Sequence, residues 1–279
     1  MEVLVTGHKG FVGEYLAKAL EAQGKKVTGF DIVDNNKDNI RYSHLIDSLI
    51  KNTKPDEIYH LAALTYVPET FDCPELTIST NTTGTVNVLE AIRKYSPKSK
   101  LLYVSTGDAL SNSSPYTISK LASEYFCQLY HDLYRINVVI VRPSPHTGAG
   151  RPSQFAESSW AKQIVKIEKG EQKEIKHGNL GSLRSYLDVR DVVKAYLIAI
   201  DQKPGVYNIC SNRRITMKQV LDMLISNAKC EIKTEIDSDL YRVTNHSPKI
   251  EANLPGWEPE IKIEDTLKEL LNYWRKRVL

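Results

Sequence analysis

The sequence predicts an α/β protein with a Rossmann-like, doubly wound parallel sheet and a smaller C-terminal lobe. Three observations lead to this prediction. The chain begins with an apolar strand that runs through a glycine-rich turn into a helix. Apolar runs then alternate with helical patterns over most of the chain, and this alternation breaks in two later segments.

The first strand and turn predict a dinucleotide site. Val3–Val5 is apolar without alternation, which is typical of a buried strand. Gly7 suits a tight turn, Gly10 permits close approach of backbone to a pyrophosphate, and Gly13 permits close packing of the helix that starts near residue 11. The N–H groups at the start of that helix would hold the phosphates. The alternative is an ordinary glycine-rich loop. The residues assigned to the cofactor here are Gly7, Gly10, Phe11, Val12 and Gly13.

The later elements follow in a regular order. Runs that predict strands lie at residues 3–5, 26–30, 57–61, 101–105, 137–141 and 206–210. Helical patterns lie near residues 11–23, 42–53, 76–95, 115–134 and 191–201. Such alternation indicates a parallel sheet, whose ligands bind beyond the carboxyl ends of the strands. We therefore expect an NAD(P)-binding domain of residues 1–145 and 179–206 and a second lobe of residues 146–178 and 207–279.

Composition excludes several classes of protein. With 41% hydrophobic and 25% charged residues, the chain is typical of globular proteins, and a net charge of +3 does not predict nucleic-acid binding. No stretch approaches the roughly 18 apolar residues that span a membrane, and a strand that begins at residue 3 leaves no room for a targeting peptide. The four widely separated cysteines indicate reduced thiols in the cytoplasm, and we expect no metal site.

An acidic residue ends the second predicted strand. Asp31 lies about 20 residues after the glycine turn, where a carboxylate suits hydrogen bonds to the adenosine ribose and repels the 2′-phosphate of NADP. We therefore favour NAD(H) as the cofactor. Lys37 and Arg41 can still accommodate a phosphate, so NADP(H) stays open, and Asp31 can equally be a plain turn residue.

A tyrosine and a lysine predict the chemistry. Tyr116 and Lys120 lie four residues apart at the start of a predicted helix, which places both side chains on one face. A neighbouring ammonium lowers the pKa of a phenol from about 10, so that Tyr116 can donate or accept a proton. Thr106 ends the preceding strand, and its hydroxyl can bond a substrate oxygen. Together these groups indicate carbonyl–alcohol redox chemistry; the alternative is a pair on a helix surface.

Further motifs match one known family over nearly the whole chain. They are Thr6–Gly13, His60–Ala63, Asn81–Asn87, Tyr103–Thr106 and the Tyr116–Lys120 pair. On these residues the chain resembles the extended short-chain dehydrogenase/reductase family. The resemblance implies that Lys120 also holds the nicotinamide ribose. It implies further cofactor contacts at Asn39, Ile40, Leu61, Ala62, Ala63, Asn81 and Pro143.

The second lobe resembles a narrower group within that family. Arg142–Arg151, Arg184–Asp191 and Tyr207–Ser211 look like the enzymes that handle GDP-linked 4-keto-6-deoxyhexoses. The resemblance implies that this lobe binds the nucleotide sugar and that Arg184 and Arg242 grip its diphosphate, a task that suits guanidinium groups. The alternative is that both are surface arginines. Other expected substrate contacts are Thr106, Asp108, His146 and Arg151.

Three reactions of the family stay open. A 4,6-dehydratase needs an additional acid and base, usually carboxylates directly after the active-site hydroxyl. Here Gly107 supplies no proton, and Asp108 is one methylene shorter than the usual Glu. We therefore predict a reductase of deoxysugar and cell-surface polysaccharide biosynthesis, which reduces the C4 ketone with NAD(P)H. A dehydratase or a 4-epimerase is the alternative, and a non-catalytic NAD(P)-binding sensor is a remote one.

The resemblance also implies an assembly. The helices near residues 76–95 and 115–134 would pair with those of a second subunit into a four-helix bundle, which makes a homodimer the expected state. Their apolar residues can equally belong to the core of one subunit.

Overall fold

The computed structural model describes residues 1–33, 38–240 and 247–278. The chain forms two compact units. The first unit consists of Met1–Pro143, Val193–Ile209 and Ala252–Trp257, and the second of Ser144–Val192, Cys210–Glu251 and Glu258–Leu279. These boundaries differ from those expected. Leu183–Arg184 and Leu187–Asp188 pair with strands of the second unit, and the side-chain oxygen of Asn253 accepts the N–H of Asn208 in the first. The functional assignment of the two domains stays a prediction.

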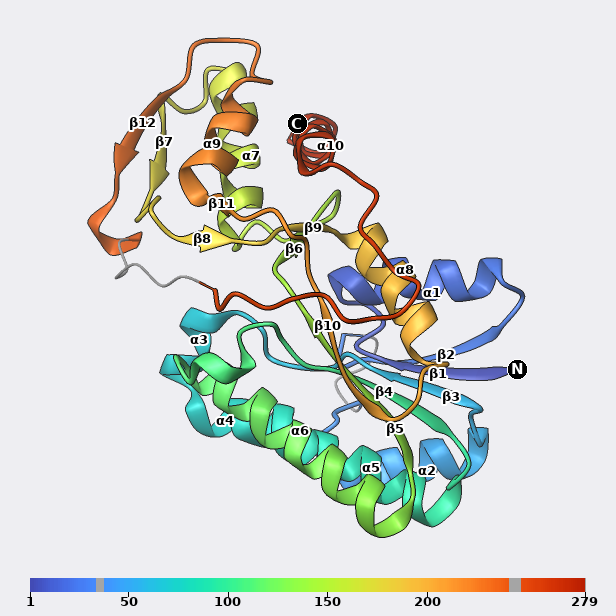
Figure 1. Ribbon diagram of the computed structural model, residues 1–279. Coiled ribbons are helices and arrows are strands. Elements are labelled where there is room, and N and C mark those ends of the chain that lie inside the picture. Colours follow the sequence, from blue (N-terminus) through green and yellow to red (C-terminus); the bar gives the residue numbers. More distant parts are fainter. Residues whose placement is uncertain (34–37, 241–246, 279) are drawn as a thin grey trace. The chain divides into compact units, whose positions relative to one another are not determined.

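The first unit contains the predicted parallel sheet (Figure 1). Its strands are β1 (Glu2–Thr6), β2 (Lys26–Phe30), β3 (Glu57–His60), β4 (Lys100–Val104), β5 (Asn137–Pro143) and β10 (Gly205–Ile209). They lie in the order β10-β5-β4-β3-β1-β2, and every neighbouring pair is parallel. The strand order reverses between β1 and β3, as in doubly wound sheets. The predicted fold class is confirmed, and all six predicted runs are strands of this sheet.

Helices cover both faces of this sheet. They are α1 (Phe11–Ala22), α2 (Ser43–Thr53), α3 (Val67–Asp72), α4 (Pro74–Ile78), α5 (Gly84–Tyr95), α6 (Pro115–Tyr134) and, from Val193 onward, α8 (Val189–Ala199). α1 lies on one face, and α2, α5 and α6 lie on the other (Figure 1). The helix expected near residues 76–95 is not continuous, because a π-helical turn, Ser79–Thr83, separates α4 from α5. A short 3₁₀ turn, Ala109–Ser111, precedes α6.

The core explains why these segments form strands and helices. Val3, Leu4 and Val5 are fully buried, as expected for a strand covered on both faces. Each such side chain contributes about 1.5–3 kcal/mol relative to an exposed one. One hydrophobic cluster in this unit joins α2, α5 and α6 to the sheet; its members include Leu4, Ile46, Ile50, Ile58, Val88, Ile92, Leu101, Val138 and Ile140.

The described residues of the second unit form the helices α7, α9 and α10, the first turn of α8 and short strand pairs. Its elements are β6 (His146–Thr147), α7 (Ala156–Glu168), β7 (Glu174–His177), β8 (Leu183–Arg184), β9 (Leu187–Asp188), β11 (Ile215–Thr216), α9 (Met217–Ile225), β12 (Lys233–Ile236), the 3₁₀ turn Ser238–Leu240 and α10 (Ile263–Arg275). β6 pairs with β9, β7 with β12 and β8 with β11. α7, α9 and α10 share a core that includes Trp160, Ile164, Val220, Leu224, Leu267 and Leu271.

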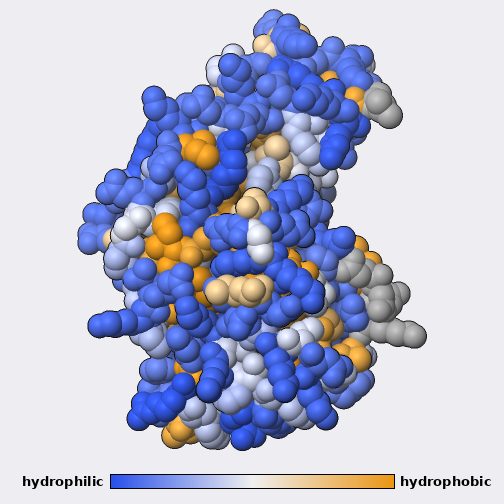
Figure 2. All heavy atoms as spheres, turned by 90° about the vertical axis from the view of Figure 1, so that its right-hand side faces the viewer, coloured by the Kyte–Doolittle hydropathy of each residue, from blue (hydrophilic) through white to orange (hydrophobic). Residues whose placement is uncertain are grey.

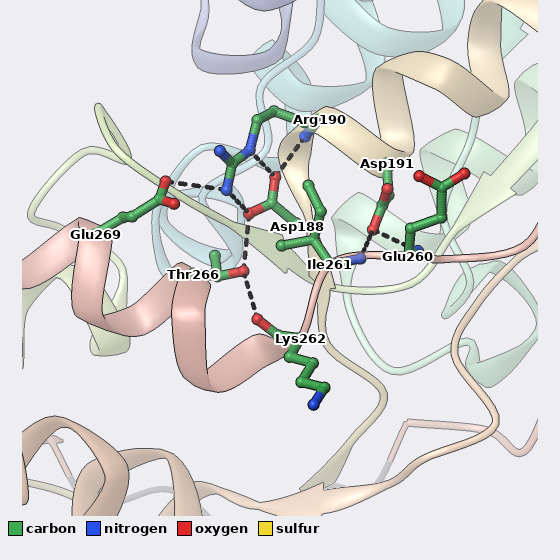
Figure 3. Close-up of polar contacts among 8 residues, drawn as sticks. All are labelled: Asp188, Arg190, Asp191, Glu260, Ile261, Lys262, Thr266 and Glu269. Carbon is green, nitrogen blue, oxygen red and sulfur yellow. Dashed lines mark hydrogen bonds and ion pairs between the residues drawn. The ribbon is translucent and has the colours of Figure 1, made fainter.

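Two buried aspartates hold the entry to α10 in this unit (Figure 3). Asp188 accepts hydrogen bonds from the Arg190 guanidinium and, at 2.8 Å, from the Thr266 hydroxyl. The Asp191 carboxylate accepts hydrogen bonds from two consecutive backbone N–H groups, those of Glu260 at 3.1 Å and Ile261 at 2.9 Å. The start of α8 and the start of α10 are therefore joined by charge-assisted hydrogen bonds, which are stronger than neutral ones.

In the part of the chain that the structure describes, no helix combines the length and the apolar character that crossing a membrane requires. The face drawn in Figure 2 is mostly hydrophilic and carries several separate apolar patches.

Candidate active site

The glycine turn has the geometry that its sequence predicts. Gly7 has φ +74°, and a Cβ there would lie 2.8 Å from the Ala62 nitrogen. A Cβ at Gly13 would lie only 2.2 Å from the Gly7 carbonyl oxygen. Gly10 is the N-cap of α1 and has no side chain that could cap the helix, and a helix start presents backbone N–H groups of the kind that bind anions. The turn therefore fits the diphosphate of a dinucleotide.

Asp31 directly follows β2 and is buried beside this turn. Its carboxylate accepts the backbone N–H of Lys9 at 3.0 Å and that of Val33 at 3.1 Å. Asp31 thus stabilises both the glycine turn and the turn that follows β2. A carboxylate oxygen can accept more than one hydrogen bond, so these bonds are compatible with the predicted ribose contact.

Two of the expected cofactor contacts, Asn39 and Ile40, are buried. The Asn39 side-chain oxygen accepts the backbone N–H and the Nε–H of Arg41, both at 3.1 Å. Ile40 packs into the core, and a Cβ at Gly84 would lie 2.8 Å from it. Their contacts with a cofactor stay predictions.

Leu61–Ala63 directly follow β3, beside the glycine turn. The Ala62 N–H donates to the Thr6 hydroxyl at 3.3 Å. Asn81 lies in the π-helical turn with its side chain fully engaged: its oxygen accepts the Leu64 N–H, and its nitrogen donates to the Leu64 carbonyl and the Ser119 hydroxyl. The segment after β3 is therefore fastened to both β1 and α6.

A buried histidine continues this network in one defined protonation state. Thr85 donates its only hydroxyl hydrogen to the Asn81 carbonyl at 2.6 Å, so His60 must donate from Nε2 to Thr85 over 3.0 Å. The His60 Nδ1 then accepts the Thr6 hydroxyl at 2.7 Å. Burial, reinforced by the nearby Lys120 ammonium, lowers the pKa of His60 to about 3, which keeps the ring neutral.

The predicted tyrosine and lysine lie in the first two turns of α6. Ser114 caps this helix, accepting the backbone N–H of Thr117, and Pro115 is its first residue. Lys120 is buried, and its ammonium lies 4.6 Å from the centre of the Tyr103 ring. Burial lowers the pKa of Lys120 to about 8, opposed by the charge of Glu124. Tyr116 is half-buried on the same helix face.

Thr106 and Asp108 lie just beyond β4. The Thr106 hydroxyl oxygen accepts the Asp108 N–H at 3.2 Å, and the Gly107 N–H donates to the Pro143 carbonyl at 2.8 Å. Among the described residues, the buried Oδ1 of Asp108 has no hydrogen-bond partner. Since β4 and β5 are parallel neighbours, Thr106 and Pro143 lie close together at the carboxyl ends of these two strands (Figure 1).

The second unit brings together two of the predicted arginines. Burial raises the pKa of Tyr186 well above its usual value. The positive charges of Arg184 and Arg151 both act on this phenol and oppose that increase. The Arg151 guanidinium stacks on the Phe155 ring, 3.5 Å from its centre, and lies 3.5 Å from the Glu157 carboxylate. Tyr186 is half-buried, and its hydroxyl donates to the Glu157 carboxylate at 3.4 Å. Two cations and one carboxylate around this phenol leave a net positive charge, which suits an anionic group.

His146 and Arg242 complete the predicted substrate residues. His146 donates from Nδ1 to the Ser144 carbonyl at 2.9 Å, and burial lowers its pKa to about 4, so the ring is neutral. Arg242 lies outside the described residues, as does Lys37.

Sequence reasoning missed Ser105 and Glu124. Both are buried, and they hydrogen-bond to each other directly beside the predicted catalytic residues. A signal was present, because Glu124 follows Lys120 by four residues and must share its helix face. Across the described ranges, 1–33, 38–240 and 247–278, no group of three or more His, Cys, Asp or Glu side chains could hold a metal ion.

Curated relatives cover the whole chain. A GDP-6-deoxy-D-mannose reductase of Pseudomonas aeruginosa is 30% identical over 99% of this chain and 98% of its own length. A human dTDP-D-glucose 4,6-dehydratase is 28% identical over 98% of this chain and 90% of its own length.

Solved structures share the fold. RMD from Pseudomonas aeruginosa, complexed with NADPH, has a TM-score of 0.86 at 29% identity and covers 99% of both chains. A UDP-glucose 4-epimerase of Thermus thermophilus, in complex with NAD, has the same TM-score at 22% identity and covers 99% of this chain and 100% of its own. Residues 3–210 match the model of the NAD dependent epimerase/dehydratase family, which confirms the resemblance seen in the motifs. The chain belongs to this NAD dependent epimerase/dehydratase family.

Proposed function

We propose that this enzyme is a nucleotide-sugar reductase that converts the C4 ketone of a GDP-linked 4-keto-6-deoxyhexose to an alcohol with a nicotinamide cofactor. The observation that carries the proposal is the buried Lys120 one turn after Tyr116, with Gly107 rather than an acid after Thr106. Identity to the Pseudomonas reductase over the whole chain supports the choice of substrate class.

The residues of the site have complementary roles in this reaction. The reduced nicotinamide supplies the hydride. Tyr116 donates its phenolic proton to the carbonyl oxygen as that oxygen becomes an alkoxide. The Lys120 ammonium stabilises the resulting phenolate, and the Thr106 hydroxyl orients the oxygen by a hydrogen bond. One ketone, one hydride and one proton thus yield one alcohol.

NAD(H) is the proposed cofactor, with NADP(H) as the alternative. The position of Asp31 directly after β2 supports this choice, because a carboxylate there would repel a 2′-phosphate. Its bonds to the N–H groups of Lys9 and Val33 fix its orientation. The NADPH complex of the Pseudomonas relative supports the alternative. The ratio of kcat/KM for NADH to that for NADPH, measured with one keto sugar, decides between them.

A 4,6-dehydratase is the second candidate, and one observation favours it. The buried Oδ1 of Asp108 has no hydrogen-bond partner among the described residues, so this carboxyl group is available to a substrate. A 4-epimerase would use the same tyrosine, lysine and threonine. Both alternatives retain the hydride on the enzyme, whereas a reductase consumes one cofactor per product.

The deciding experiment supplies GDP-mannose and GDP-4-keto-6-deoxymannose separately, each with NADH or NADPH. We expect absorbance at 340 nm to fall only with the keto sugar, with one alcohol formed per cofactor oxidised. Conversion of GDP-mannose without net cofactor use would establish the dehydratase instead. Tyr116→Phe should abolish turnover while leaving cofactor binding intact; a protein that binds NAD(P)H but turns over neither sugar would be a sensor.

We propose that the protein is a homodimer in the cytoplasm. The exposed face of α6 carries an apolar stripe at helical spacing, formed by Ile118, Tyr125, Phe126, Leu129 and Leu133. Such a stripe suits a four-helix bundle with a second copy. Light scattering should give the mass of two chains, and a monomer mass alone would contradict the dimer.

All four cysteines are free thiols, which supports a reducing compartment such as the proposed cytoplasm.

A further inference from the structure

One buried carboxylate contacts three segments of the predicted active site. Glu124 lies on α6, one turn after Lys120, and its side chain is 1% exposed. It accepts a hydrogen bond from the Ser105 hydroxyl. It also forms a two-pronged ion pair with the Arg142 guanidinium, at 2.9 Å to Nε and 2.5 Å to Nη2.

The partners of Glu124 are the neighbours of active-site residues. Ser105 directly precedes Thr106 at the end of β4, and Arg142 directly precedes Pro143 at the end of β5. The carboxylate therefore joins the helix that carries Tyr116 and Lys120 to the ends of two strands. A small displacement of a reacting group costs much of the rate, so such a connection acts directly on catalysis.

Glu124 also acts electrostatically on the Lys120 ammonium, because its negative charge raises the pKa of Lys120. Three other titratable groups lie near Lys120, namely His60 on β3, Tyr103 on β4 and Cys127 on α6. Tyr116 precedes Lys120 by one helical turn. Burial holds the pKa of His60 low and raises those of Tyr103 and Cys127, so none of the three carries a charge near pH 7. The Arg142 cation on β5 pairs with the Glu124 carboxylate and opposes the effect of its negative charge on Lys120.

Stability alone does not account for this arrangement. Removing two charges from water costs several kcal/mol per ion, and well-packed apolar residues often replace a buried ion pair without loss of stability. What distinguishes Glu124 from other buried ion-pair partners is its position, one helical turn from Lys120 and bonded to the residues that precede Thr106 and Pro143. This position points to a role in the reaction.

We propose that Glu124 is a positioning residue of the reductase, which sets Thr106 against Tyr116 through Ser105 and keeps Lys120 in its ammonium form. The proposal rests on the proposed function, because it assigns Glu124 to the reaction that Tyr116, Lys120 and Thr106 would perform. Its consequence is that the charge of Glu124, and not only its shape, determines the pH range in which the enzyme works.

The test is Glu124→Gln, which keeps the shape and a hydrogen-bond acceptor but removes the charge. We expect the alkaline fall of kcat/KM for keto-sugar reduction to move to lower pH, with a loss of about tenfold at pH 7.5 and a largely unchanged KM. A second readout needs no substrate: the NMR signal of ¹³Cε-labelled lysine, assigned by its absence in Lys120→Met, should titrate at lower pH in the variant.

Glu57→Gln is a closely matched control. Glu57 is 3% exposed and pairs with Lys25, 18% exposed, at 2.8 Å; the corresponding values for Glu124 and Arg142 are 1% and 17%. This pair lies at the amino end of β3, so its loss should lower stability without moving the pH profile. A shift of equal size in both variants would mean that general loosening is the cause, and would overturn the proposal.

A second variant keeps the proposal testable where Glu124→Gln does not fold. Arg142→Gln removes the opposing cation, so the titration of Lys120 should move to higher pH, the opposite direction. Unchanged Lys120 titration in either folded variant overturns the proposal, whatever the substrate proves to be. If no keto sugar is reduced by the wild type, the proposed function fails while the NMR titration still measures the effect of Glu124.

Discussion

Polar side chains at the amino ends of the parallel strands form separate ion pairs, whereas those at the carboxyl ends form connected networks. Lys26 pairs with Glu2, and Lys100 pairs with Asp201, both at exposed positions. At the carboxyl ends, in contrast, Thr6 and His60 belong to a buried network that reaches α5 and α6. Both ends join segments that are distant in sequence, but these amino-end pairs are exposed and separate, whereas the carboxyl-end bonds run from one buried residue to the next.

This difference between the two ends of the strands predicts which substitutions should affect catalysis. An exposed ion pair contributes little, about 0–1 kcal/mol, and its removal affects two residues. A buried network has a partner for every donor, so a change at one position displaces the others. We therefore expect substitutions at the carboxyl ends to alter binding and rate, and substitutions at the amino ends to alter stability alone.

The largest effect is expected at the glycine turn after β1. In Gly13→Ala the new methyl group would lie 2.2 Å from the Gly7 carbonyl oxygen, so the turn must shift. We expect NADH to bind roughly a hundredfold more weakly, since overpacking costs about 1–3 kcal/mol. Fluorescence titration measures the binding. Gly205→Ala in β10, where a Cβ meets only ordinary contacts at 3.8 Å, should leave the Kd unchanged.

The next effect concerns pH. Lys120 must be an ammonium for reduction, and burial lowers its pKa to about 8. The charged form is present below this pH and lost above it, so kcat/KM should be level below pH 8 and fall about tenfold per pH unit above it. Stopped-flow measurement from pH 6 to 9.5 tests this. A profile that stays level to pH 9.5 would remove Lys120 from the proposed role.

A smaller effect is expected at the end of β2. Asp31→Asn keeps one acceptor for the N–H groups of Lys9 and Val33 and removes the charge. The ratio of kcat/KM for NADPH to that for NADH should rise about tenfold, which corresponds to about 1.4 kcal/mol. An unchanged ratio would mean that Asp31 is only a turn residue. Thermal unfolding of the variant separates a cofactor effect from a loosened turn.

The smallest catalytic effect is expected at the amino end of β3. Glu57→Gln breaks the buried pair with Lys25, so the free energy of unfolding should fall by about 1–3 kcal/mol. Steady-state kinetics should match the wild type, because the side chain of Glu57 bonds Lys25 and Tyr59, at the amino end of β3. Urea denaturation measures the stability. A loss of kcat/KM beyond about threefold would contradict the distinction between the two ends of the sheet.

The sheet and the glycine turn were predictable because local patterns specify them. A strand covered on both faces must be apolar throughout, as Val3–Val5 is, and a turn with φ +74° that touches neighbouring backbone must be glycine, as Gly7 is. The spacing of Tyr116 and Lys120 likewise implies one helix face. By itself, then, the sequence determined the fold class, the geometry of the glycine turn and the placement of the tyrosine and lysine on one helix.

Only the tertiary structure decided which distant residues meet. The π-helical turn at Ser79–Thr83 contains Asn81, whose side chain bonds two other segments, and no pattern in residues 76–95 indicates it. Glu124 joins Ser105 and Arg142 because α6 packs across β4 and β5, a contact between residues up to 19 positions apart. Periodicity describes one element at a time. The partners of a buried polar group depend on how several elements pack, and that information appears only when the chain has folded.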